Sequence, residues 1–185
     1  MLVNKLNFFI LTGGPGSGKS AIIEQLKAQG YICCEEVGRQ IIQEQLAMGG
    51  NALHWGDRLK FRDLMFARSI EDYARLQNET GFVLFDRGIP DLIGYCHLIN
   101  EPVPDEYWNA VKAYRYNPLV FIAPPWQEIY VNDKERKQDF QEAIDTYESI
   151  KKGYLACGYQ VAELPKSSIE DRVQFILSHQ KLSST

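Results

Sequence analysis

The segment NFFILTGGPGSGKSAIIEQL, residues 7–26, joins an apolar run to a glycine-rich loop and then to a helical pattern. Asn7–Thr12 is almost wholly apolar, as expected of a buried strand, and the pattern over residues 19–29 predicts a helix. The loop between them has the spacing G-x-x-x-x-G-K-S, which is informative when a strand precedes it and a helix follows. Both conditions are met, so the segment predicts a phosphate-binding loop over Gly13–Ser20.

Each residue type in this loop has a physical reason to face a phosphate group. Gly13 and Gly18 leave room for backbone amides to converge on phosphate oxygens, in conformations that are costly for other residues. The following helix points unpaired N–H groups and the positive end of its dipole at the same anion. Lys19 is expected to reach the β and γ phosphates, and the Ser20 hydroxyl to bind Mg²⁺. The predicted ligand is Mg-ATP, and the predicted nucleotide-binding residues are Gly13, Gly14, Pro15, Gly16, Ser17, Gly18, Lys19, Ser20 and Ala21.

Apolar runs and helical patterns alternate along the rest of the chain. After Asn7–Thr12, the runs typical of buried strands are Tyr31–Glu36, Phe82–Asp86, Leu119–Ala123 and Tyr159–Leu164. Helices are expected at about 19–29, 36–49, 57–79, 89–99, 104–116, 139–152 and 168–180. Strands without strict alternation, separated by helices, indicate a parallel sheet that is covered on both faces. We therefore expect an α/β fold.

Length and charge narrow the class of protein. A chain of 185 residues without repeats or a linker corresponds to one domain, residues 1–185. The formal net charge of −4 provides no basic surface for a nucleic acid or an anionic membrane. The longest early apolar run, Phe8–Leu11, is too short for a membrane span or the core of a signal peptide. A cytoplasmic protein without nucleic-acid or membrane partners is expected.

The strand at Phe82–Asp86 ends in an aspartate, at the position from which a carboxylate supports Mg²⁺ beside a phosphate loop. Asp86 is therefore a candidate metal ligand and catalytic residue, with capping of the next helix as the alternative. A GTPase would continue as D-x-x-G, but Gly88 comes one residue early and the sequence has no N-K-x-D motif. Arg87 stands where oligomeric AAA motors usually carry a glutamate. Both a GTPase and a motor are disfavoured.

The loop at Gly13–Ser20, the acidic pair Glu35–Glu36, the run Asp86–Gly88 and a late basic segment together resemble P-loop kinases that act on small molecules. The sequence is most similar to bacterial predicted ATPases with an AAA-like domain, akin to nicotinamide riboside kinase, thymidylate kinase and deoxynucleoside kinases. The resemblance covers nearly the whole chain. It implies a three-layer P-loop fold with five parallel strands in the order 2-3-1-4-5 and a site at their carboxyl ends.

The resemblance also implies roles for charged residues. In deoxynucleoside kinases a glutamate at the end of the second strand acts as the base toward the acceptor hydroxyl, and Glu36 matches that position. Adjacent strand residues point opposite ways, so at most one of Glu35 and Glu36 faces the site, and Glu36 is nearer the loop. Arg39 could share a helix face with Glu36 and hold the acceptor, or form a surface ion pair with it. Arg87 is the second candidate for holding the acceptor.

Two later segments match kinase loops by position. Residues about 124–139 lie where related kinases carry a mobile lid, and Arg136, with Lys137, is a candidate for stabilising the transferring phosphoryl group. A solvated loop of alternating charge is the alternative. Pro165–Ser168 matches the adenine-packing loop, although either of its serines could instead cap the last helix. Four aromatic residues could stack on a base but are expected in the core: Tyr114, Tyr116, Trp108 and Trp126.

These features favour transfer of the γ-phosphoryl group of ATP to a small acceptor, nucleoside-like or another metabolite. The expected catalytic residues are Lys19, Glu36, Asp86 and Arg136. A nucleotide hydrolase or ATP-driven switch would use the same loop with water or a partner protein as the acceptor, and a non-catalytic nucleotide-binding module ranks last. Helices 36–49 and 57–79, which would build the acceptor pocket, carry no recognised code for the acceptor. No pattern specifies the oligomeric state.

Overall fold

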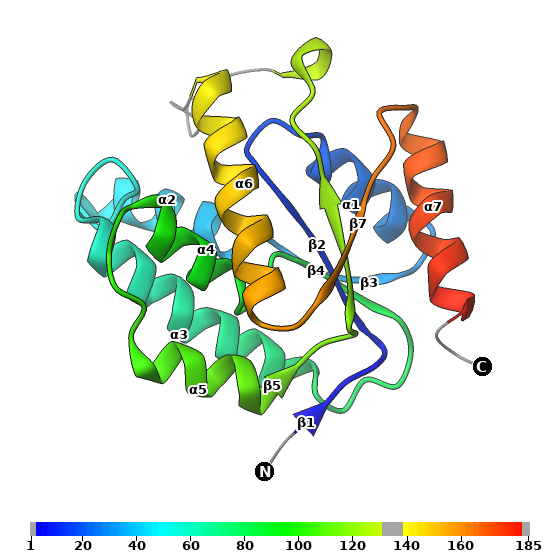
Figure 1. The fold of residues 1–185 in the computed structure, drawn as a ribbon, viewed down its shortest axis with the longest axis horizontal. Coiled ribbons are helices and arrows are strands. Elements are labelled where there is room, and N and C mark those ends of the chain that lie inside the picture. Colours follow the sequence, from blue (N-terminus) through cyan, green and yellow to red (C-terminus); the bar gives the residue numbers. More distant parts are fainter. Residues whose placement is uncertain (1–2, 131–138, 183–185) are drawn as a thin grey trace.

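The computed structural model describes residues 3–130 and 139–182. At its centre lies a five-stranded sheet in which all paired strands are parallel (Figure 1). In spatial order the strands are β3 (Ile32–Cys34), β4 (Val83–Asp86), β2 (Phe8–Gly13), β6 (Leu119–Ala123) and β7 (Gln160–Glu163). Numbered along the chain, these five strands have the order 2-3-1-4-5. The α/β class and the strand order are therefore confirmed.

The central strands are buried on both sides. All six residues of β2 and all four of β4 are buried, which explains why neither strand shows polar alternation in the sequence. Leu11 of β2 lies opposite Asp86 of β4, and Gly13 lies opposite Ala123 of β6. This register brings the carboxyl ends of three strands to one edge of the sheet, where the glycine-rich loop begins.

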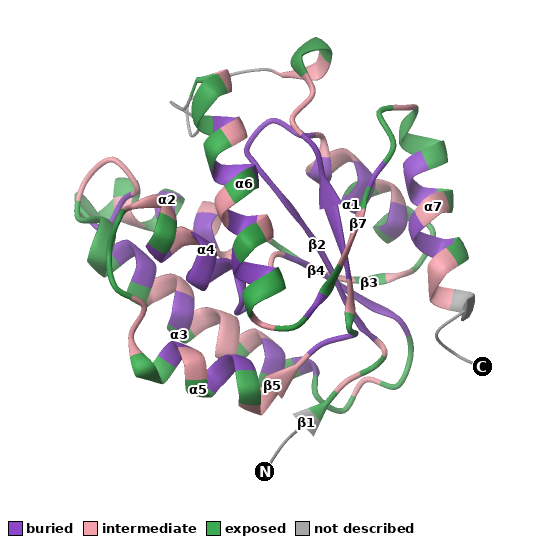
Figure 2. Cartoon of the chain, in the orientation of Figure 1, coloured by how far each residue is buried: buried purple, intermediate pink, exposed green. Residues whose placement is uncertain are grey.

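Helices cover the two faces of the sheet and make three layers, with exposed residues on the outer surfaces of the helices (Figures 1 and 2). Phe9 and Leu11 pack with the helices of one face, whereas Phe8 and Ile10 pack with those of the other. The first face carries α1 (Lys19–Ala28) and α7 (Ile169–Leu182). The second carries α3 (Arg58–Leu76), α4 (Asp91–Leu98), α5 (Asp105–Ala113) and α6 (Phe140–Ala156), with α2 (Val37–Met48) packed against α3. A short 3₁₀ turn, η1 (Gln127–Ile129), follows β6.

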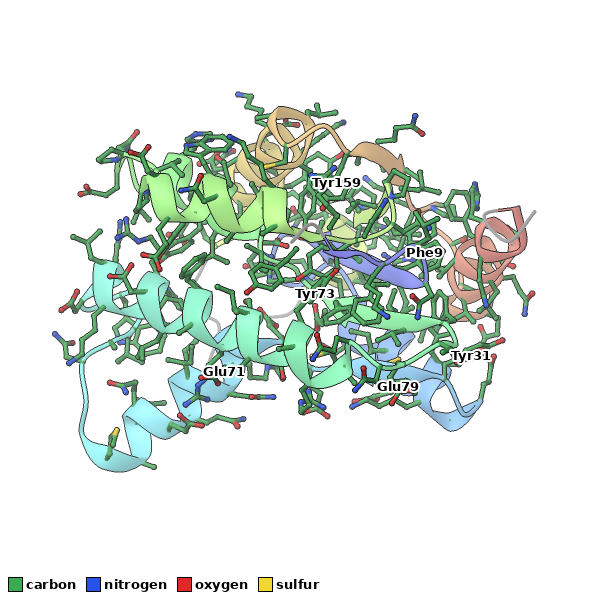
Figure 3. All side chains as sticks on the ribbon, turned by 90° about the horizontal axis from the view of Figure 1, so that it is seen from below. Phe9, Tyr31, Glu71, Tyr73, Glu79 and Tyr159 are labelled. Atoms are coloured by element: carbon green, nitrogen blue, oxygen red, sulfur yellow. The ribbon has the colours of Figure 1, made fainter. Side chains whose placement is uncertain are left out.

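The longest helix, α3, shows how one apolar face fixes a helix on the sheet. Tyr73 lies between α3 and the sheet and is 1% exposed, whereas Glu71 lies on the solvent side of the helix (Figure 3). Asp57 caps the start of α3 by accepting a hydrogen bond from the backbone N–H of Lys60 at 3.0 Å. Across residues 3–130 and 139–182, no helix combines the length and the apolar character that crossing a membrane requires.

Three predicted helix ends differ from the observed ones by three or four residues, and the helix expected over residues 57–79 ends at Leu76. The helix expected over residues 104–116 ends at Ala113, and Tyr114–Arg115 instead forms a short strand, β5, that pairs in parallel with β1 (Val3–Asn4). The helix expected to end at residue 152 continues to Ala156, because Gly153 is a point of contact with α4. A Cβ atom at Gly153 would lie 2.7 Å from the backbone nitrogen of Gly94, so the two helices approach backbone to backbone.

Candidate functional site

The glycine-rich loop connects β2 to α1 in a conformation that needs glycine at its two ends. Gly13 has φ +136°, and a Cβ atom there would lie 2.4 Å from the carbonyl oxygen of Ala123 on β6. Gly18 has φ +82° and immediately precedes the first residue of α1. Both positions combine a left-handed backbone with close neighbours, so another residue would be strained. These are the two glycines for which the sequence predicted this requirement.

Lys19 lies across the loop rather than in solvent. It is 5% exposed, and its ammonium group donates to the carbonyl oxygens of Gly13 at 3.3 Å and Gly14 at 3.0 Å. The Ser17 hydroxyl also donates to the Gly14 carbonyl, at 2.8 Å. Ser20 follows Lys19 in the first turn of α1 and is partly exposed. The loop therefore holds a cation and a hydroxyl at the positive end of a helix, an arrangement suited to a phosphate and its metal.

Asp86, at the end of β4, is a buried carboxylate with unused bonding capacity. It is 7% exposed, and within the described part of the chain its Oδ1 atom has no hydrogen-bond partner. Burial and then the neighbouring Glu36 carboxylate raise the pKa of Asp86 to about 7, while Lys19 and Arg87 lower it. It does not cap α4, because the start of that helix has Pro90 at the N-cap position and shows no side-chain capping bond among the described residues. An unsatisfied buried carboxylate beside the loop is what a cation site requires.

Arg87 joins the ends of two strands to the start of α4. Its backbone has φ +72°, and its N–H donates to the carbonyl oxygen of Leu11 on β2 at 3.0 Å. Its Nε atom donates to Glu36 Oε1 at 3.0 Å, and its Nη1 atom to Asp91 Oδ1 at 3.3 Å. Burial alone would lower the pKa of Arg87. The carboxylates of Glu36, Asp91 and Asp86 outweigh that effect and raise the pKa above its usual value, so the guanidinium stays charged. Its side chain is therefore fixed between two acids.

The structure places Glu35 and Glu36 differently. Glu35 forms an ion pair with Lys27, with 63% of its side chain exposed, whereas Glu36 pairs with Arg87 and 23% of its side chain is exposed. Glu36 directly precedes the first residue of α2, and Arg39 in the first turn of that helix is partly exposed. Glu36, Arg39 and also Glu35 line the same cavity. What separates the two glutamates is that Glu36 is less exposed and pairs with the partly buried Arg87, whereas Glu35 pairs with Lys27.

A cavity extends from the phosphate loop into the layer of α2, α3, α4 and α6. Pro15 and Lys19 line its loop end together with Glu36, Asp86 and Arg87. Its far end is mainly apolar and is lined by residues that include Ile42, Phe61, Met65 and Tyr95. The charged end and the apolar end belong to one space, so a bound molecule can meet both.

Asp91 is a site residue that sequence reasoning missed. It is 4% exposed and accepts hydrogen bonds from Thr12, the residue before the loop, and from Tyr154 of α6, in addition to those from Gly88 and Arg87. An acidic residue in the first turn of a helix usually satisfies the helix end, which hides any wider role. The sequence feature that could have indicated this wider role was the position of Asp91 three residues after Gly88. Asp91 ties the phosphate loop to the Arg87 turn.

Arg172 is the second residue that the sequence did not single out. It lies on α7, is 2% exposed, and donates from Nη2 to the carbonyl oxygen of Ser17 at 2.9 Å. Its guanidinium lies over the ring of Trp126, at 5.9 Å from the centroid. Nothing in the sequence distinguished this arginine from a surface residue of an amphipathic helix. Burial in the folded chain is what reveals it.

The remaining predictions concern the later segments. Arg136 and Lys137 of the lid-like segment lie outside the described residues. Ser168 accepts a hydrogen bond from the N–H of Asp171 at 3.1 Å, which supports the capping role in the loop 165–168. Of the aromatic residues, Tyr116 is 1% exposed in the core, and Trp108 and Tyr114 pack against that core. Trp126 is different, because it contacts Arg172 near the loop.

Solved structures with this fold include small-molecule kinases. Deoxyadenosine kinase from M. mycoides, with dCMP and dCDP bound, is 14% identical, covers 96% of this chain and 100% of its own, and has a TM-score of 0.66. NadR protein in complex with NR is 16% identical over 99% of this chain and 52% of its own, with a TM-score of 0.69. Thymidylate kinase from Candida albicans is 15% identical over 96% of this chain and 92% of its own, with a TM-score of 0.66. The chain thus has the fold of P-loop small-molecule kinases.

Sequence comparisons give a family assignment. The sequence matched none of the curated proteins in the search. A family model described as an AAA domain matches residues 8–172, which include the phosphate loop, Asp86, Arg87 and Asp91. Because that model spans most of the chain, the protein belongs to this AAA-domain family.

Proposed function

We propose that this chain is a kinase that transfers the γ-phosphoryl group of Mg-ATP to a small molecule. The observation that carries the proposal is the cavity beyond the phosphate loop, where Glu36, Arg87 and Asp86 stand beside Lys19. A hydrolase requires access for water alone, whereas this cavity continues into an apolar end built from four helices. A cavity of this kind next to the expected γ-phosphate suits an acceptor larger than water.

In this proposal the loop from Gly13 to Ala21 binds the phosphates of ATP. Its backbone N–H groups and Lys19 neutralise the triphosphate, and phosphoryl transfer depends mainly on such positioning and charge. Mg²⁺ would be held by Ser20 and Asp86, and the unsatisfied Oδ1 atom of Asp86 fits an oxygen-ligated cation. When bound, Mg²⁺ supplies charge neutralisation for the phosphate oxygens.

The acceptor would meet the other side of the site. Glu36 is placed to orient the acceptor hydroxyl and to take its proton, and Arg87 holds Glu36 in position. Arg39 and Arg87 line the same cavity, and either of them would bind the acceptor. By resemblance, Arg136 would stabilise the phosphoryl group during transfer.

A direct test uses ATP labelled at the γ-phosphate and a panel of small alcohols, nucleosides and phosphate esters. We expect the label to appear in one acceptor class in a Mg²⁺-dependent reaction, and Lys19→Met to abolish this transfer. The matched control is Lys27→Met, because Lys27 is on the same helix but pairs with the exposed Glu35. Release of the label as inorganic phosphate alone, whatever the acceptor, would instead identify a hydrolase.

A further inference from the structure

The electrostatics of the cavity bear on the kind of acceptor. At its loop end the carboxylates of Glu36, Asp86 and Asp91 surround one guanidinium, that of Arg87, which already pairs with two of them. Lys19 is directed at the carbonyl oxygens of the phosphate loop. Arg39 and His54 are the other basic residues among the described residues of the lining, which also includes the carboxylates of Glu35 and Asp72. A phosphate or carboxylate on the acceptor would therefore enter a site rich in negative charge.

The far end of the cavity points to the body of the acceptor. The rings of Phe61 and Tyr95 meet edge to face with centroids 6.1 Å apart, and Ile42 and Met65 line the same end. The Tyr95 hydroxyl is buried and has no hydrogen-bond partner among residues 3–130 and 139–182. Ser69 and His54 also line the cavity, and aromatic and aliphatic side chains with a few polar groups among them are typical of pockets for flat ring systems.

We propose, given the kinase function above, that the acceptor is an uncharged or cationic alcohol with a flat apolar body, not a phosphate ester or a carboxylic acid. A nucleoside has this chemistry. The acceptor hydroxyl oxygen bonds to the γ-phosphorus, the bond from that phosphorus to the β–γ bridging oxygen breaks, and the hydroxyl proton passes to Glu36. The products are the phosphate ester and ADP. The charge at the loop end excludes anionic acceptors, and the apolar end binds the ring.

The test compares acceptors that differ in one charged group. Each of a set of nucleosides is assayed beside its 5′-monophosphate, with γ-labelled ATP, and simple sugars serve as alcohols without a ring body. We expect kcat/KM for the best nucleoside to exceed that for its monophosphate and for the sugars by about 100-fold. Preference for the monophosphate would overturn the inference and leave the kinase function standing. Hydrolysis of ATP without transfer to any compound would overturn both.

A second experiment tests the apolar end with a matched pair of substitutions. Met65→Gln places an amide among Phe61 and Tyr95, whereas Met48→Gln makes the same change on α2 where the side chain is 72% exposed. We expect Met65→Gln to raise the KM for the acceptor about 10-fold and to leave the KM for ATP unchanged. Met48→Gln should change neither. Equal acceptor kinetics in the two variants would place the acceptor elsewhere.

An independent observation concerns Arg172, a buried cation behind the phosphate loop. It is 2% exposed, its Nε atom has no hydrogen-bond partner, and none of the described residues forms an ion pair with it. Its described bond is to the carbonyl oxygen of Ser17, and a Cβ atom at Gly18 would lie 2.7 Å from its Nη1 atom. A buried charge without a counter-charge is costly unless a ligand supplies one.

The geometry points to Arg172 as a positioning residue for the triphosphate. It holds the loop at Ser17 and Gly18, and its charge acts on the phosphates through a water-excluded region, where electrostatic interactions are stronger than in solvent. The phosphates in turn provide the counter-charge that the folded chain lacks at this point. The effect should therefore grow with the number of phosphate groups on the nucleotide.

The test measures the binding of ATP, ADP, AMP and adenosine by wild type, Arg172→Met and Arg172→Lys. We expect Arg172→Met to weaken the binding of ATP about 10-fold, to weaken the binding of ADP less, and to leave the binding of adenosine unchanged. Arg172→Lys should restore part of the lost affinity for ATP. Lys152→Met, the same charge change on the exposed surface of α6, is the control. Equal weakening for ATP and adenosine, with a lowered Tm of the nucleotide-free protein, would show a merely structural residue. Unchanged binding of ATP would also overturn the inference.

Discussion

The proposed phosphate side and the proposed acceptor side of the site are built in different ways. The phosphate side is one continuous segment, Gly13–Ser20, and Lys19 bonds to backbone carbonyls within it. The acceptor side depends on side-chain pairs between distant elements, such as Arg87 and Glu36, which are 51 residues apart. The phosphate loop itself is thus set by local sequence, while the acceptor side requires the assembled fold.

The largest expected effect lies on the phosphate side. Lys19→Met removes a nearly buried ammonium group that the loop positions for the triphosphate, so the Kd for ATP should rise roughly 1000-fold. Isothermal titration calorimetry gives the Kd directly. Lys27→Met, at the exposed end of the same helix, should leave it unchanged. ATP binding that survives in Lys19→Met would break the distinction between the two sides.

The acceptor side predicts the next largest effect. Glu36→Gln removes the proposed base while keeping its shape, so kcat for phosphoryl transfer should fall about 100-fold with the Kd for ATP unchanged. Steady-state kinetics and nucleotide titration separate the two quantities. Glu35→Gln is the matched control, because Glu35 pairs with Lys27 and is largely exposed. Similar losses in both variants would contradict the choice of Glu36.

Asp91 links the two sides, and its loss should affect both. Asp91→Asn weakens a buried carboxylate that accepts hydrogen bonds from Thr12, Gly88, Arg87 and Tyr154. We expect the free energy of unfolding to fall by about 2 kcal/mol, together with weaker binding of ATP and of the acceptor. Denaturant titration measures the first effect, with Asp105→Asn on an exposed helix start as the control. A change confined to one side would show that Asp91 does not couple them.

The last prediction is a pH dependence of stability that arises from Asp86. Because folding raises the pKa of this carboxyl from 3.8 to about 7, the folded state favours its protonated form. In EDTA, the free energy of unfolding of wild type relative to Asp86→Asn should be highest below pH 4 and fall as the pH rises toward 7. The slope is at most about 1.4 kcal/mol per pH unit. Unfolding curves at several pH values measure it, and parallel curves for the two proteins would contradict the shift.

Most of the fold followed from local patterns. The apolar runs at Phe8–Gly13 and Val83–Asp86 predicted buried parallel strands because strands covered on both faces have no polar side. The end of α6 was missed because Gly153 resembles a stop, while its contact with Gly94 becomes evident only when the two helices are packed. The pairing of Val3–Asn4 with Tyr114–Arg115 is likewise tertiary and left no local signal.

The candidate site likewise contains residues that a local motif predicts and residues that only the folded structure reveals. The geometry of Gly13, Gly18 and Lys19 follows from the loop motif, since the backbone conformation itself demands those residues. Arg172 could not be identified from sequence, because its role depends on burial against a loop 155 residues away. Asp91 was missed for a related reason: an acid at a helix start has a sufficient local explanation. Residues whose importance depends on distant partners need a structure.

The contact between Gly94 and Gly153 has a mechanical consequence. With no side chains between them at this point, the backbones of α4 and α6 lie in direct contact, so we expect the two helices to move together. This pair of helices runs from Asp139 and Phe140 at the start of α6 to Asp91 at the start of α4. We therefore expect a displacement at the start of α6 to move Asp91, the carboxylate that pairs with Arg87.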